Sequence, residues 1–379
     1  MKTRKQSNKK STIGVKTSNK TTLKNMARSF SPIVNKNLDV TSLKTLKYRS
    51  IKLCDSLLEI NVGTASEPNC LNFTTAEVKK FLLKNLKSSK HLKPERFIAP
   101  KQLHSNCWFN TMFVTFFFSD KGRKFFRFFR NLMITGKKQD NIKLEDPELK
   151  KLLFIFNLYI EASYNQSSNK TLNNKANLHE QVKKLTSKLD TNYLIKNIYN
   201  RIKHNKPHYD LPDIDEAGNP LEYYKTIMQY LKYDVLNIIN LTINKNYKLI
   251  YDSIDEVLNE NYDTVGDMIV IEDHESGMEY ETSYELEFNG KKYKYVLDSI
   301  ILTNTGHYIP SKDSHFVSVL TINKVGYKFD GSSYSRLSKY DWKPLINTNK
   351  DWSFKENPDY YPEKYNFTKA YKILFYYRN

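Results

Sequence analysis

The stretch "KQLHSNCWFNTMFVTFFF", residues 101–118, places Cys107 directly before a long apolar run, with Gln102 and Asn106 ahead of it. An apolar run of this kind predicts a buried helix that begins near the cysteine. Cys107 is then open to two interpretations. It is a small buried hydrophobe, the common case for a lone cysteine, or it is a nucleophile placed at a helix N-terminus.

A second stretch offers partners for a nucleophile. A thiol attacks carbonyl groups as its thiolate, which is favoured at a helix N-terminus and beside an imidazole that a carboxylate or amide orients. In "SHFVSVLTINKVGYKFDGSS", residues 314–333, His315 opens a strand and Asp330 follows the returning strand. Because the ends of an antiparallel hairpin are neighbours, we expect His315 and Asp330 to meet.

The periodicity of apolar residues changes along the chain. Helical spacing is found in residues 74–89, 147–164, 177–204 and 221–236, and "SDKGRK" at 119–124 divides the Phe-rich region into two helices. From about residue 265 the period is two, and "NG" at 289–290 predicts a hairpin turn. The order predicts an α+β fold in which a helical lobe packs on an antiparallel β-sheet lobe.

The segment "FFRFFR", residues 125–130, has two interpretations. It is a membrane-active segment, or its Phe residues form a buried helix face while the Arg side chains extend outward to solvent. We favour the buried face, because Arg stems pack along apolar surface while their heads reach water.

The basic charge is concentrated near the N-terminus. Residues 1–50 contain thirteen Lys or Arg and one acid, Asp39, within a chain of net charge +19. We expect residues 1–40 to form a disordered basic tail and residues 41–99 a helical extension, ahead of a catalytic domain at 100–379. The tail is either a tether with weak affinity for nucleic acid or other polyanions, or a solubilising or targeting segment.

The remaining features exclude several classes of protein. Three cysteines predict neither a disulfide framework nor a zinc site. A reducing compartment, cytoplasmic or nuclear, is therefore expected. No apolar run approaches 18 residues, so we expect no membrane partner. His179-Glu180 lacks the second His of a zinc-protease helix, Asp213 to Glu216 lacks a calcium-loop Glu, and no glycine-rich phosphate loop is present. We expect no cofactor.

Four segments together resemble the ubiquitin-specific proteases. "NCWFNTMFVTFFF" is similar to the family's cysteine box, N-x-C-[YF]-x-N-[ST]. "NPLEYYKTIMQYL" at 219–231 is similar to its helix D-A-x-E-F-L-x-x-L-L-x-x-L. The segment at 293–333 resembles its histidine box, and "AYKILFYYR" at 370–378 resembles its closing strand. The four fall in the family's order and cover about residues 100–379.

The resemblance implies a papain-like cysteine protease. Cys107 would be the nucleophile, His315 the general base and then acid, and Asp330 the group that orients the histidine. Gln102 matches the residue that completes the oxyanion hole, together with the backbone N–H of Cys107. The bond cut would follow the C-terminal Gly of ubiquitin or a similar modifier, so the implied partners are ubiquitin or a ubiquitin-like protein and ubiquitinated proteins.

The sequence also departs from the family pattern. The paired C-x-x-C zinc knuckles of the family's fingers are missing, which implies reduced fingers without zinc. The family's G-H-Y occurs at residues 306–308, so His307 competes with His315. We prefer His315 because it leads directly into the hairpin that returns to Asp330, whereas Pro310 follows His307 where the strand belongs. The second Asp of the family's F-D-D is Gly331 here.

Such divergence resembles ubiquitin-protease-like enzymes of large DNA viruses, for which the virion or host cytoplasm would be the location. Two alternatives therefore stand beside a deubiquitinase. One is a viral maturation protease with another Gly-rich substrate. The other is a catalytically silent ubiquitin-binding module.

Overall fold

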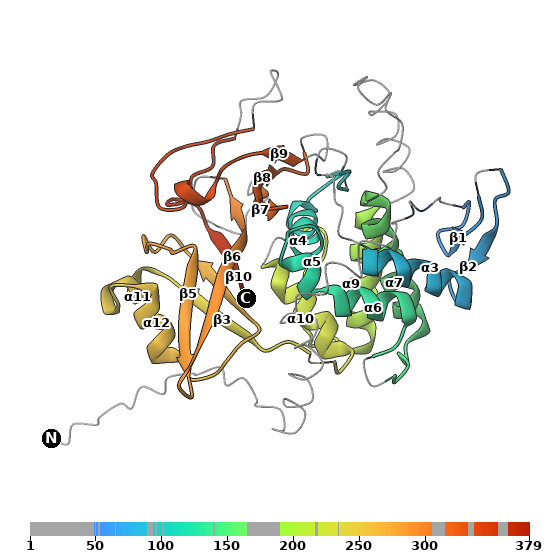
Figure 1. The fold of residues 1–379 in the computed structure, drawn as a ribbon, viewed down its shortest axis with the longest axis horizontal. Helices are drawn as coiled ribbons and strands as arrows, with labels where there is room; N and C mark the ends of the chain where they lie inside the picture. Colours follow the sequence, from blue (N-terminus) through green and yellow to red (C-terminus); the bar gives the residue numbers. More distant parts are fainter. Residues whose placement is uncertain are drawn as a thin grey trace.

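The computed structural model describes residues 49–379 apart from residues 50, 52–53, 65, 89–93, 95–96, 101, 139–140, 165–189, 217–218, 234, 305–314, 333–336 and 355–362. The tail expected at residues 1–40 lies outside the described residues. Most helices gather on one side of the molecule, while a large sheet and helices α11 and α12 lie on the other, and helix α4 lies beside strand β7 (Figure 1). The fold is thus mixed, with helices and one large sheet.

The helical side follows the predicted segments closely. Its helices are α3 (Ala76–Ser88), α4 (Cys107–Phe117), α5 (Gly122–Phe125), α6 (Arg127–Thr135), α7 (Pro147–Ser163), α9 (Thr191–Asn205) and α10 (Pro220–Tyr230). Helix α7 shows why they begin where they do. Asp146 accepts hydrogen bonds from the N–H groups of Glu148 and Leu149, and Pro147 occupies the first helical position. The predicted part at 177–189 lies outside the described residues.

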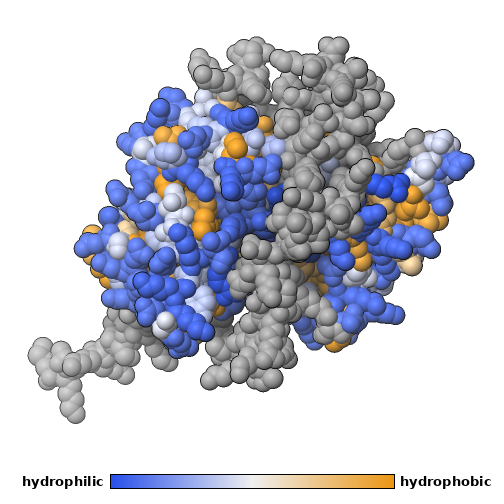
Figure 2. Space-filling view, viewed as in Figure 1, coloured by the Kyte–Doolittle hydropathy of each residue, from blue (hydrophilic) through white to orange (hydrophobic). Residues whose placement is uncertain are grey.

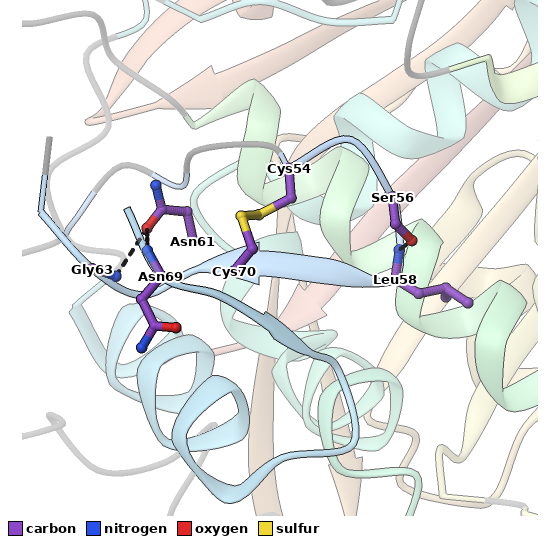
Figure 3. The surroundings of a disulfide bond; sticks show 7 residues. All are labelled: Cys54, Ser56, Leu58, Asn61, Gly63, Asn69 and Cys70. Carbon is purple, nitrogen blue, oxygen red and sulfur yellow. Dashed lines mark hydrogen bonds between the residues drawn. A yellow bond between two sulfur atoms is a disulfide. The ribbon is translucent and has the colours of Figure 1, made fainter. Parts of the chain in front are cut away.

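A small hairpin precedes these helices, within the extension at residues 41–99 that was expected to be helical. Its strands are β1 (Glu59–Asn61) and β2 (Cys70–Asn72). It brings Cys54 and Cys70 together, with their Cα atoms 6.1 Å apart, and the two form a disulfide (Figure 3). The expectation that the cysteines are unpaired is therefore wrong for this pair. The argument from cysteine usage for a reducing compartment no longer follows.

The large sheet contains β3 (Ile238–Ile243), β4 (Met268–Asp273), β5 (Ser283–Phe288), β6 (Lys291–Thr303), β7 (Phe316–Ile322), β8 (Val325–Phe329), β9 (Leu337–Lys339) and β10 (Lys372–Arg378). The strand order is β3-β4-β10-β6-β7-β8-β9, and β5 pairs with β6. All pairs are antiparallel except β3–β4, which is parallel and was not expected. The predicted hairpin at Asn289-Gly290 is confirmed, with both residues at positive φ.

Both faces of the sheet's central strands are buried, so β7, β10 and the second half of β6 are buried almost without interruption. On β10, Ile373 and Phe375 pack into the core shared with the helical side, while Leu374 and Tyr376 pack into a second core. Helices α11 (Lys245–Ile250) and α12 (Ile254–Asn261) and the segment with the short 3₁₀ helix η4 (Lys343–Leu345) lie on the second side. The helical lobe therefore covers only one face of the sheet.

The Phe-rich segment is buried, but the direction predicted for its Arg side chains is wrong at one position. Phe125, Phe126, Phe128 and Phe129 are all buried, as expected. Arg130 is also buried, and its guanidinium donates to Asn157 (3.0 Å) and to the Glu161 carboxylate. A carboxylate on the neighbouring helix α7 supplies inside the protein the partner that water would otherwise provide.

Two aspartates fasten the end of α4 to the sheet. The backbone N–H of Asp120 donates to the carbonyl of Thr321 (2.8 Å), and its carboxylate accepts from the backbone of the β7–β8 turn at 323–324 (2.9 Å each). Asp298 on β6 accepts from the backbone N–H groups of Lys121 (2.9 Å) and Gly122 (3.2 Å). The position of α4 along β7 is therefore fixed by hydrogen bonds at its C-terminal end.

The surface in the view of Figure 2 is mainly hydrophilic, with small separate hydrophobic areas. Among the helices that the structure describes, none is long and apolar enough to cross a membrane.

We predict that Asp298→Asn removes a pH-dependent loss of folding stability. Burial raises the pKa of Asp298 to about 6, so the folded protein binds more protons than the unfolded chain between about pH 4 and pH 6. Stability of the wild type should then fall as pH rises through this window. Asparagine keeps the acceptor oxygen without titrating, so its advantage should grow by up to about 3 kcal/mol from pH 4 to pH 8. Urea unfolding across this range measures it, and parallel stability curves for the two proteins would contradict it.

Candidate active site

Cys107 is the first residue of helix α4, as its position before the apolar run suggested. Every residue of α4 is buried, and Cys107 itself is 5% exposed. The helix is held by aromatic packing, including Trp108 against Tyr223 with ring centroids 5.2 Å apart. The thiol therefore lies at the positive end of the helix dipole, in a rigid setting.

The β7–β8 hairpin brings His315 and Asp330 together. Strands β7 and β8 are joined by a two-residue turn, Asn323-Lys324, with both residues at positive φ. His315 directly precedes β7 and Asp330 directly follows β8, so the register places them at the same end of the hairpin. His315 Nε2 lies 2.7 Å from Asp330 Oδ1.

Further hydrogen bonds hold both members of this pair. The one made by His315 had no signal in the sequence. Its backbone N–H donates to the side-chain oxygen of Asn304 (3.1 Å), at the end of β6. Asp330 accepts from the backbone N–H and the hydroxyl of Ser332, both at 2.8 Å. The sequence "DGSS" at 330–333 is typical of a turn closed by such Asp and Ser contacts, so Ser332 could have been found. Asn304 carries no comparable local signal.

The electrostatics favour a charged imidazole. Burial by itself lowers the pKa of His315, but hydrogen bonds to Asp330 and Cys107 and the charges of the same two groups outweigh it and raise the pKa to about 10. Burial raises the pKa of Asp330, but the His315 contacts and the Ser332 hydrogen bonds outweigh it and lower the pKa below its ordinary value. His315 thus carries a proton at neutral pH between a carboxylate and a sulfur. Since Nε2 faces Asp330, Nδ1 is the nitrogen left for the sulfur.

Gln102 lies on the Asp330 side of the same site. Its backbone N–H donates to the carbonyl of Gly331 (3.0 Å), and a Cβ atom built on Gly331 would lie 3.5 Å from Gln102 Cβ. The Gln102 Oε1 atom is buried without a hydrogen-bond partner among the described residues. Oxyanion stabilisation would use the amide N–H groups of this side chain rather than its oxygen, so the unpaired oxygen does not itself assign a role to Gln102.

The structure thus gathers Cys107, His315, Asp330 and Gln102 in one place. His307 lies outside the described residues, so the preference for His315 over His307 stays a prediction. Within the described parts of the chain, no group of three or more His, Cys, Asp or Glu side chains could hold a metal ion. The chemistry available to the gathered residues is that of a thiol beside an oriented imidazole.

Comparisons with known proteins give structural likeness without sequence likeness. No protein-family model matches the sequence, and no curated protein matches it. Among solved structures, the chain is similar to the SAGA Ubp8/Sgf11/Sus1/Sgf73 DUB module bound to ubiquitin aldehyde (11% identity, TM-score 0.40, 76% of this chain and 70% of that chain). It is also similar to the Ubp8-Sgf11-Sgf73-Sus1 SAGA DUB module (10%, 0.39, 94% and 94%).

A third neighbour is the Saccharomyces cerevisiae apo Pan2 pseudoubiquitin hydrolase-RNA exonuclease module in complex with AAGGA RNA (10% identity, TM-score 0.38, 76% of this chain and 54% of that chain). These neighbours are deubiquitinase or ubiquitin-hydrolase-like modules. Likeness at this level does not assign an activity, so the functional argument rests on the residues of the site.

We predict that Asp330→Asn lowers the pKa of His315 from about 10 towards its ordinary value. The amide can still accept a hydrogen bond, but it removes the negative charge that favours the protonated ring. NMR titration of the His315 ring protons in both proteins measures the change, with the ring of His208, outside the site, as internal reference. An unchanged His315 titration in the variant would show that Asp330 does not set the charge of the imidazole.

Proposed function

We propose that this chain is a papain-like cysteine protease of the ubiquitin-specific-protease type. It would hydrolyse the peptide or isopeptide bond after the C-terminal Gly of ubiquitin or a similar modifier. The observation that carries the proposal is that one imidazole, His315, contacts both a buried carboxylate and the thiol at the start of α4. Each of these residues alone has a common structural explanation, but their joint arrangement is that of an activated thiol.

The first half of the reaction forms an acyl-enzyme. The sulfur of Cys107 forms a bond to the carbonyl carbon, and the carbonyl electron pair moves onto the oxygen. The backbone N–H of Cys107 and the Gln102 amide are the proposed donors to that oxyanion. His315 then gives its proton to the leaving amine as the C–N bond breaks, and a thioester remains.

The second half returns the enzyme to its starting state. Neutral His315 takes a proton from a water molecule, whose oxygen forms a bond to the thioester carbon. The C–S bond then breaks, the carboxylic acid product leaves, and His315 and Cys107 regain their starting charges. Throughout, Asp330 holds the ring orientation through Nε2 and stabilises its positive charge.

The substrate class follows from the four family-like segments. Between α10 and β5 this chain has β3, α11, α12 and β4, and we propose that this region takes the place of the family's zinc-binding fingers. We propose that ubiquitin, or a related modifier, is bound by this reduced region without zinc. A viral maturation substrate and a silent binding module are the competing outcomes of the experiments below.

We predict that ubiquitin carrying a C-terminal electrophile forms a covalent adduct with the protein through Cys107. Mass spectrometry of the modified peptide identifies the residue, and Cys107→Ala should abolish the adduct. If the wild type binds ubiquitin without forming an adduct, the protein is a binding module. If Cys107 reacts with iodoacetamide but not with the ubiquitin probe, the thiol is activated for a different substrate.

A separate prediction concerns the two histidines. His315→Ala should reduce cleavage of a fluorogenic ubiquitin substrate by about 10³-fold or more, because it removes the proton carrier. His307→Ala is the matched variant and should leave a measurable rate. Reversal of these two results would identify His307 as the base and overturn the assignment of His315.

A further inference from the structure

Three buried polar residues next to Cys107 form a closed ring of hydrogen bonds. The Asn106 amide donates to the Thr191 hydroxyl (2.8 Å), which donates to the Asn110 side-chain oxygen (3.5 Å). The Asn110 amide in turn donates to the Asn106 side-chain oxygen (3.4 Å). None of the three is more than 1% exposed. Each side chain therefore gives one hydrogen bond and receives one, as in networks whose members strengthen each other.

The ring changes what Asn106 does at the start of α4. Asn106 occupies the N-cap position, where an asparagine side chain ordinarily accepts a hydrogen bond from the second or third helical N–H group. Here it makes no such bond: its oxygen and its amide are both used in the ring, and its backbone (φ −95°, ψ 16°) lies outside the extended region usual for a capping residue. Among the described residues, no group accepts a hydrogen bond from the backbone N–H groups of residues 107–109.

The ring also reaches the other side of the site. A Cβ atom built on Gly331 would lie 3.3 Å from the Asn110 amide nitrogen, so Asn110 lies against the turn that follows Asp330. Thr191 is the first residue of α9, which is tied to α7 where the Tyr159 hydroxyl donates to the Asp190 carbonyl (2.9 Å). The start of α4, the start of α9 and the turn after Asp330 thus share one set of contacts.

We infer that Asn106, Asn110 and Thr191 are positioning residues that keep the first turn of α4 uncapped and hold Cys107 against His315. The inference rests on the proposed function, since it takes Cys107 as the nucleophile. The uncapped N–H groups remain available to the sulfur anion and to the oxyanion that forms from the substrate. If the ring opens, the Asn106 side chain is free to turn and cap the helix, and these donors are withdrawn from the reaction.

Thr191→Val tests this inference, because valine has the shape of threonine without the hydroxyl. We expect alkylation of Cys107 by iodoacetamide to need a higher pH, with its midpoint raised by about one pH unit as donors to the anion are lost. For a ubiquitin substrate we expect kcat to fall by about 10²-fold with little change in KM. Thr191→Ser keeps the hydroxyl and should restore both quantities.

Thr115→Val is the matched control. Thr115 is a fully buried threonine of α4, the helix that begins with Cys107, and its hydroxyl donates to the carbonyls of Thr111 (2.9 Å) and Met112 (3.1 Å), outside the ring. Its substitution should alter thermal stability without moving the alkylation midpoint. A shift in Thr191→Val that is absent in Thr115→Val therefore reports positioning rather than general loss of stability.

The inference is overturned if Thr191→Val has the alkylation profile of the wild type, whatever its melting temperature. If Thr191→Val fails to fold by circular dichroism, Asn106→Ser replaces it, since serine caps helices well and cannot supply the amide donor of the ring. Asn106→Ser should also raise the pH midpoint of alkylation, and a wild-type profile would overturn the inference. Alkylation needs no substrate, so this result is distinct from failure of the ubiquitin probe, which contradicts the proposed function and not the measured effect of the ring on Cys107.

Discussion

The site depends on the packing of helix α4 along the β7–β8 hairpin, which is fixed at both ends. At one end, Asp120 bonds the carbonyl of Thr321 and the hairpin turn. At the other end, Cys107 is one of the groups that raise the pKa of His315. The chain from Cys107 to Asp120 spans roughly 20 Å at the rise of a helix, and the strand from His315 to Thr321 spans roughly 20 Å at the rise of a strand. Because these two lengths agree, the contacts at both ends can form together. A shift of one residue in either element would separate the thiol from the imidazole.

The charged groups of the site stabilise the fold near neutral pH. The pKa of His315 is raised to about 10, so its contribution is complete below its unfolded value and is lost as pH rises through about 10. The pKa of Asp330 is lowered, so its contribution is present above its unfolded value and is lost as pH falls through the lowered one. Asp298 behaves in the opposite way, because burial favours its protonated form. The charged forms of His315 and Asp330 are thus stabilised by their contacts in the folded protein.

Contacts between residues joined by a short turn could be predicted from the sequence, whereas contacts between separate elements could not. The His315–Asp330 contact could be expected because a short turn fixes the register between them. The disulfide was missed because the strands that join Cys54 to Cys70 are three residues long and give little periodic signal. Arg130 was expected to face water because its partner, Glu161, lies 31 positions away on another helix. The parallel pairing of β3 with β4 was missed for the same reason, since two helices intervene.

The hydrogen-bonded ring shows this limit most clearly. Asn106 and Asn110 are visible in the sequence as residues one turn apart on α4, but Thr191 lies 81 positions from Asn110. From the sequence alone, Asn106 before a helix would be taken as an ordinary cap. Only the three-dimensional structure shows that the amide is used elsewhere, since a cap and a ring member have the same residue type and the same place in the chain.

A helix can do without its cap when other interactions stabilise it. Loss of an asparagine cap costs about 1 kcal/mol, whereas a buried hydrogen bond contributes about 0.5–1.5 kcal/mol, so the ring offsets the loss. The greater support comes from burial, because all eleven residues of α4 are buried and each large apolar side chain contributes about 1.5–3 kcal/mol. The run "WFNTMFVTFFF" therefore makes local capping dispensable. That leaves the N–H groups of the first turn, beside Cys107, free to bind an anion.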